Sequence, residues 1–222
     1  MSIYMIGGGK GGVGKSLVSM ALIDYLACQE KPPVIIESDT SNPDVGKSCM
    51  KSSEVQFLNL DINEGWLDFI EIAAASKSDL VVNLASRSNV AINKYGETLR
   101  NALDEINHDF RTIWVINRQR DSIELALEYQ DIMPGRFDIL LNGYFGEKEK
   151  FVHFNGLKSK EKILRAGGKV GWFPDLGDRV TDEMNIKRLT VAKALEEMSL
   201  SSRAELSRWR KEAANTFKTI EI

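Results

Sequence analysis

Apolar residues follow two alternating patterns along this chain. Short continuous apolar runs are typical of buried strands, whereas longer segments with apolar residues every three or four positions are typical of helices. The helical segment at 16–29, for example, places Val18, Leu22 and Leu26 on one face. Strands are predicted at 2–7, 32–38, 55–61, 79–85, 112–117, 137–145 and 169–174. Helices are predicted at 16–29, 64–76, 90–106, 122–133, 178–198 and 202–217.

This alternation predicts an α/β fold with a mostly parallel sheet and helices on both faces, because continuous apolar strands must be covered on both sides. The 222 residues show no linker, repeat or low-complexity tract, so one domain spanning 1–222 is expected. Segment 143–162 is predicted to be a long surface loop with an embedded helical turn.

The loop between the first strand and the first helix carries the pattern GxxxxGK[ST] as "GKGGVGKS". Its glycines allow successive backbone amides to surround an anion, and the helix N-terminus adds a partial positive charge. Lys15 is expected to reach the β- and γ-phosphates, and the Ser16 hydroxyl to bind Mg²⁺. The predicted phosphate-binding residues are Gly9, Lys10, Gly11, Gly12, Val13, Gly14, Lys15 and Ser16.

The additional lysine, Lys10, makes this loop resemble the deviant Walker A loop of the ParA/MinD family of dimerising ATPases. The resemblance implies a P-loop NTPase architecture that binds ATP and Mg²⁺. It also implies that Lys10 reaches across an ATP-dependent homodimer, so that Lys10 and Lys15 are both catalytic. Dimerisation would then depend on the nucleotide.

Two further segments fall where that family places its metal and water ligands. "VIIESDTSNPDVGKS" is similar to the second strand and switch I, which makes Asp39 a catalytic residue that positions water near the metal. An acidic strand-end cap is the less favoured alternative for Asp39. "DLVVNLAS" is similar to Walker B, with Asn83 where the family has a Mg²⁺-binding aspartate. Asn is nearly isosteric with Asp and can still accept a hydrogen bond, so Mg·ATP binding is expected to persist. Because Asn carries no negative charge, hydrolysis is expected to be slow.

The later segments resemble the family's base-binding elements. "FDILLNGYFG" matches the strand whose Asn, here Asn142, recognises adenine, and "VGWFPDLGDRV" matches the segment that closes over the base near Pro174 and Asp175. Within the family, these segments look most like those of TraL-type conjugal-transfer and plasmid-mobilisation ATPases.

Charge and cysteine content limit the expected partners and location. The net charge is -3, but residues 1–150 carry 15 basic and 22 acidic residues, and residues 151–222 carry 14 and 10. This C-terminal excess of four is a weak indication of DNA binding. Cys28 and Cys49 form no CxxC pair, and no segment approaches the roughly 18 apolar residues of a membrane span. A cytoplasmic location is expected.

Two polar or amphipathic segments have simple structural interpretations. The helix at 202–217 is expected to pack on the protein's own sheet or on a partner, and membrane binding is disfavoured by its glutamates. "NRQRDS", at 117–122, is interpreted as a solvated helix N-terminus capped by Asp121 or Ser122, with an interaction surface as the alternative.

The sequence therefore predicts an ATP-dependent dimerising switch ATPase of plasmid DNA transfer, mobilisation or partition, with a conjugation or partition protein as a further partner. Two alternatives stay open: a nucleotide-dependent binding module with little or no hydrolysis, and an ATP-dependent small-carboxylate ligase of the same fold.

Overall fold

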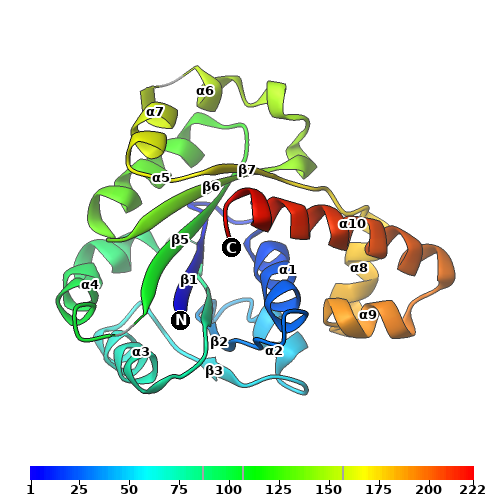
Figure 1. Ribbon diagram of the computed structural model, residues 1–222, viewed down its shortest axis with the longest axis horizontal. Helices are drawn as coiled ribbons and strands as arrows, with labels where there is room; N and C mark the ends of the chain where they lie inside the picture. Colours follow the sequence, from blue (N-terminus) through cyan, green and yellow to red (C-terminus); the bar gives the residue numbers. More distant parts are fainter. Residues whose placement is uncertain (87, 107, 157) are drawn as a thin grey trace.

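The computed structural model describes residues 1–86, 88–106, 108–156 and 158–222, and within them one seven-stranded sheet in the order β3-β2-β4-β1-β5-β6-β7 (Figure 1). Every strand pairing in it is parallel, as the continuous apolar strands predict. The strands are β1 (Ser2–Gly7), β2 (Val34–Glu37), β3 (Val55–Phe57), β4 (Leu80–Asn83), β5 (Asp109–Ile116), β6 (Arg136–Asn142) and β7 (Val170–Phe173).

Helices cover both faces of this sheet, and the sheet separates the hydrophobic core into two layers. One layer lies under α1, α2, α8, α9 and α10, and the other lies under α3, α4, α5 and α6 (Figure 1). The helices are α1 (Lys15–Ala27), α2 (Asp44–Cys49), α3 (Asn63–Ala75), α4 (Asn89–Ala102), α5 (Arg120–Ile132), α6 (Val152–Asn155), α7 (Lys158–Arg165), α8 (Asp178–Lys187), α9 (Val191–Glu197) and α10 (Leu200–Thr219). The predicted fold class is confirmed.

The structure differs from the predicted elements in three places. The segment predicted as one helix over 178–198 is two helices, because Arg188 adopts a left-handed φ of 51° and Thr190 caps the start of α9. Helix α2 was not predicted, since six residues are too few to show a helical period. The predicted loop at 143–162 contains two short 3₁₀ helices, Gly143–Phe145 and Lys148–Lys150, followed by α6 and the start of α7.

The C-terminal helix α10 packs on the protein's own sheet, which confirms that part of the prediction. Its apolar side chains Leu206, Trp209, Ala213 and Phe217 are all buried against the layer that contains α1. No helix among the described residues is long and apolar enough to cross a bilayer.

A buried ionic cluster fixes the end of α10 to the sheet. Asp138 on β6 is completely buried and accepts hydrogen bonds from Arg111 Nε at 2.5 Å and Arg136 Nε at 3.1 Å. Both guanidinium groups also donate to the carbonyl oxygen of Ile220. Arg136 also pairs with the carboxylate of Glu221 at 3.0 Å, so two carboxylates balance the two arginines and the cluster can hold the buried Ile220 against the sheet.

Candidate functional site

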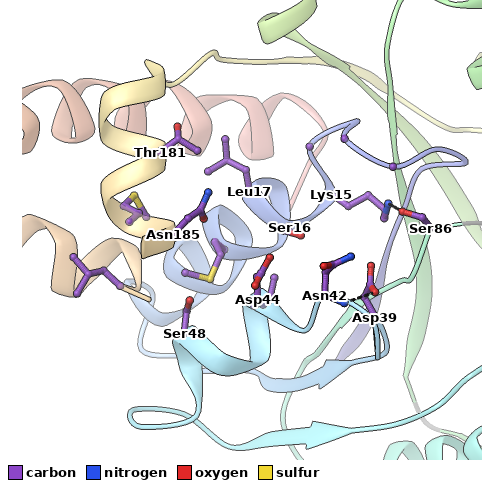
Figure 2. Close-up of a pocket in the computed structure, with 17 residues that line it drawn as sticks. Lys15, Ser16, Leu17, Asp39, Asn42, Asp44, Ser48, Ser86, Thr181 and Asn185 are labelled. Carbon is purple, nitrogen blue, oxygen red and sulfur yellow. Dashed lines mark hydrogen bonds between the residues drawn. The ribbon is translucent and has the colours of Figure 1, made fainter. Parts of the chain in front are cut away.

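A pocket of about 340 Å³ lies at the carboxyl ends of the central strands, where the β1–α1 loop turns into α1. Its walls come from this loop, from the segment between β2 and α2, and from α8 (Figure 2). The carboxyl edge of an open parallel sheet is the usual location of ligand sites in α/β proteins.

The loop itself has the geometry of an anion site. Gly12 and Gly14 adopt φ values of 73° and 99°, a backbone conformation that residues with a side chain rarely adopt. Helix α1 begins directly afterwards at Lys15, and within the described part of the chain no side chain caps its N-terminus. The first backbone amides of α1 are therefore available to a bound anion.

Lys15 is 6% exposed and lies at this helix start. Its ammonium group donates to the carbonyl oxygen of Lys10 at 3.3 Å and to Ser86 Oγ at 3.1 Å (Figure 2). Burial lowers the Lys15 pKa, and the nearby carboxylate of Asp39 opposes that shift. A phosphate group in the pocket would provide the close negative charge that this buried cation lacks.

Ser86 is a site residue that the sequence analysis did not identify. It follows β4 by three positions and lines the same pocket as Lys15 and Ser16. Its position as the last residue of the Walker B-like segment was the available signal, but serine after a strand is too common to be informative. Ser16 is exposed in the pocket, as a Mg²⁺ ligand would have to be.

Asp39 also lines the pocket, on the side opposite α8. Its Oδ1 accepts a hydrogen bond from the backbone amide of Asn42 at 2.9 Å, which orders the turn that leads to α2. Asp39 and Ser16 thus bring oxygen ligands to one cavity. With phosphate oxygens and water, this donor set suits Mg²⁺, which prefers oxygen and keeps several waters.

Asn83 has a different setting from the one its resemblance to Walker B implies. It is 1% exposed and is not among the described residues that line the pocket. Its Oδ1 accepts from Ser19 Oγ at 3.1 Å, and its Nδ2 donates to Glu37 Oε1 at 2.8 Å. With both amide atoms engaged, Asn83 links α1 to β2 behind the pocket, and its contact with metal remains a prediction.

Glu37, the partner of Asn83, is a buried carboxylate at the end of β2. Besides Asn83, the backbone amides of Asp39 and Gly46 each donate to it at 3.0 Å. Burial raises the Glu37 pKa, and these hydrogen bonds partly offset the shift. Glu37 therefore fixes the backbone of Asp39 and the first turn of α2.

Lys10 points away from the loop toward the N-terminus of α5. Its Nζ lies 2.5 Å from Asp121 Oδ2 and 3.2 Å from Gln119 Oε1. Gln119, rather than Asp121 or Ser122, occupies the N-cap of α5, and no side chain of the described residues caps it, so the predicted cap is wrong. The predicted solvated helix N-terminus is confirmed, since residues 118–121 are exposed and α5 begins at Arg120, and this turn also contacts Lys10.

The predicted base-binding residues lie outside this pocket. Asn142 Nδ2 donates to the carbonyl oxygen of Val13 at 2.8 Å, and Oδ1 accepts from the Tyr144 amide at 3.0 Å. The carbonyl oxygen of Pro174 accepts from Trp209 Nε1 at 3.0 Å, and Asp175 is exposed. Asn142 thus ties β6 to the phosphate loop, and adenine recognition by these three residues is an untested prediction.

Comparison with known proteins places this geometry in context. The chain is 45% identical over 221 residues to the protein MobD of Acidithiobacillus ferrooxidans, covering 99% of this chain and 97% of that one. It is 26% identical over 216 residues to a protein TraL of Escherichia coli, covering 90% and 89%. No family model matches the chain.

The fold is that of a solved P-loop protein. The septum site-determining protein MinD of Pyrococcus horikoshii, in complex with Mg-ADP, matches with a TM-score of 0.56 over 96% of this chain and 94% of that one. Since the two sequences are only 13% identical, this likeness shows the fold alone.

Proposed function

This chain belongs to the family of the protein MobD and has the fold of MinD, and from that premise we propose that it is an ATP-dependent molecular switch in plasmid DNA transfer or mobilisation. The similarity to TraL and the resemblance to TraL-type conjugal-transfer ATPases support this cellular role. A protein of the conjugation or partition machinery is the proposed partner. Direct DNA contact rests only on the C-terminal charge excess.

The observation that carries the proposal is the phosphate loop, in which two left-handed glycines precede an uncapped helix and a buried lysine. Gly9 to Ser16 bind the phosphates in this proposal. Mg²⁺, when bound, would neutralise phosphate oxygens, with Ser16 and Asp39 as its nearest side chains. Asp39 also orients the attacking water. Phosphoryl transfer requires mainly such positioning and charge neutralisation.

Dimerisation on ATP is the second part of the proposal, with Lys10 reaching the partner subunit's nucleotide. In the structure, Lys10 contacts Asp121 of its own chain, so it must exchange this carboxylate for phosphate. Both side chains are solvent-accessible, at 34% and 62%, so water and salt screen this ion pair and its net contribution to stability is small. The exchange is therefore energetically easy.

The test is the molar mass of the protein by light scattering with Mg·ATP or Mg·ADP. Wild type should dimerise with ATP alone. Lys10→Ala should bind ATP without dimerising, whereas Asp121→Asn should strengthen dimerisation by up to about fivefold, because it weakens the competing contact. Lys15→Ala is the control that loses nucleotide binding. If Lys10→Ala dimerises like wild type, the proposed role of Lys10 is wrong.

A nucleotide-dependent binding module without hydrolysis is the second candidate, and the setting of Asn83 favours it. The amide is neutral and engaged with Ser19 and Glu37. Steady-state phosphate release separates the two candidates, since the switch ATPase must turn over and the module must not. Nothing among the described residues favours the carboxylate ligase.

A further inference from the structure

Strand β7 forms one edge of the sheet and pairs only with β6 within the described residues. The Ile139 amide donates to the carbonyl oxygen of Lys169 at 2.9 Å, so Lys169 directs its carbonyl toward β6. Backbone groups alternate in direction along a strand. Gly171 therefore also faces β6, while Val170 and Trp172 present their N–H and C=O groups to the open edge.

The only hydrogen bond that the described residues make to these outward groups is from Thr216 Oγ1 to the Trp172 carbonyl, at 2.7 Å. An edge with unpaired backbone groups can accept a further strand from another chain. Such an addition needs space beside the edge as well as free donors and acceptors.

A groove of about 660 Å³ provides that space along β7. Its floor is the edge from Lys169 to Trp172. Helix α10 forms one wall, and Lys148, Asn155, Lys160 and Leu164 form the other. Figure 1 shows β7 between α10 and the part of the chain that contains α6 and α7. Leu164 on this wall is 46% exposed, and with Trp172 on the floor it gives the groove an apolar surface.

The charges that line the groove select among the occupants that it could take. Among the described residues, Lys148, Lys160, Lys169 and Glu212 line it. Lys169 pairs with Glu221 at 3.0 Å and Glu212 pairs with Arg208 at 2.7 Å, which leaves Lys148 and Lys160 as the excess positive charge. A second copy of this chain, paired edge to edge, would bring these lysines opposite one another, which is destabilising. An acidic segment of a different protein would meet complementary charge along the same edge.

We propose that the β7 groove binds an extended acidic segment of a partner protein, which adds to the sheet as an eighth strand. Main-chain hydrogen bonds to Val170 and Trp172 provide the affinity, and the lysines select acidic side chains on the incoming strand. Its alternate apolar side chains pack on Trp172 and Leu164. This goes beyond the proposed nucleotide-dependent function and does not require it.

The test uses fluorescence anisotropy of a labelled peptide of eight alternating glutamate and valine residues, with the full-length protein. A second peptide of the same sequence is N-methylated at alternate backbone amides and so cannot pair as a strand. We expect saturable binding of the first peptide that weakens with salt, and at least tenfold weaker binding of the methylated one.

Charge-reversal variants locate the peptide on the protein. Lys148→Glu/Lys160→Glu changes exposed or half-exposed side chains and should weaken binding at least tenfold. Lys51→Glu, close to β3 at the opposite edge of the sheet, should leave it unchanged. Thermal unfolding of each variant verifies that it is folded.

Three results would overturn the proposal. The first is no binding of the acidic peptide to wild type. The second is equal binding of the N-methylated peptide, which would show charge attraction without strand pairing. The third is unchanged peptide binding in the double variant while its binding to duplex DNA is lost, which would make the lysines a phosphate-binding surface instead.

Discussion

Replacing Asn83 by Asp tests directly whether this side chain faces a metal or holds Glu37. In the structure, Asn83 Nδ2 donates to Glu37 Oε1 at 2.8 Å, and each residue is 1% exposed. Asp would remove the donor and place a second carboxylate beside the first. If Asn83 faced Mg²⁺ instead, the same substitution would add a negative charge that strengthens Mg²⁺ binding.

The cost of the substitution follows from comparing two ways to accommodate it. Two charges at this separation repel by about 6 kcal/mol at an effective dielectric constant of ~20. The lost hydrogen bond to a charged group adds about 1.5–3 kcal/mol. Protonating one carboxyl at pH 7, from an ordinary pKa of about 4.3, costs only about 4 kcal/mol and restores a donor. Protonation is the cheaper outcome, so Asn83→Asp should lose about 4 kcal/mol at pH 7.

The sign of the pH dependence follows from that proton. The folded variant holds a proton that the unfolded chain releases above about pH 4.3, so its free energy of unfolding falls as pH rises, by about 1.4 kcal/mol per unit. In wild type, burial already raises the Glu37 pKa, so the free energy of unfolding of wild type also falls as pH rises. The quantity to compare is therefore the difference between variant and wild type at each pH.

The assay is thermal unfolding at pH 5 and pH 7.5. Asn83→Asp should unfold about 8–16 °C below wild type near neutral pH and only a few degrees below it at pH 5. Glu37→Gln/Asn83→Asp is the matched control, because it moves the charge to β4 and restores one donor and one acceptor. A variant Asn83→Asp as stable as wild type at pH 7.5, with a lower Mg²⁺ requirement for ATP binding, would refute this reasoning.

Two further predictions concern stability and reactivity. Asp138→Ala should lower the free energy of unfolding in urea by about 3–5 kcal/mol, because it leaves Arg111 buried without its carboxylate. The control Glu161→Ala, in an exposed pair on one helix, should lower it by less than about 0.5 kcal/mol. Equal losses would contradict the buried cluster. At pH 8 a thiol reagent should modify only the exposed Cys28 in the folded chain and both cysteines after unfolding. Cys49 is protected because it is buried and because burial raises its pKa to about 12. Modification of both cysteines before unfolding would contradict the packing of Cys49.

Local patterns predicted the fold because they depend on neighbours in the sequence. Each continuous apolar strand, and the glycine-rich loop between β1 and α1, is recognised from residues that are adjacent in the sequence. No glycine or proline marks the end of α8 at Arg188, so α8 and α9 were predicted as one helix. Its left-handed backbone depends on tertiary packing rather than on residue type.

The candidate site was predicted in part for the same reason. Lys15, Ser16 and Asp39 line one pocket; the first two were proposed from the phosphate-loop motif and Asp39 from the family resemblance. The partner of Lys10 could not be predicted, since Asp121 lies 111 positions away and no spacing rule connects them. Likewise, the contact of Asn142 with the carbonyl oxygen of Val13, 129 positions earlier, could not be predicted, and its proposed role in binding a base stays a prediction.

The anchoring of α10 on β5 and β6 affects how this chain is made in the cell. Arg111 donates to the carbonyl oxygens of Ile220 and Glu221, more than a hundred positions later. During translation, Asp138 and both of its arginines leave the ribosome before these last partners exist. The C-terminal half of the sheet therefore completes its folding only after residues 220 and 221 have been synthesised, and until then the nascent chain exposes β7 and the apolar layer beneath α10, where chaperones can bind.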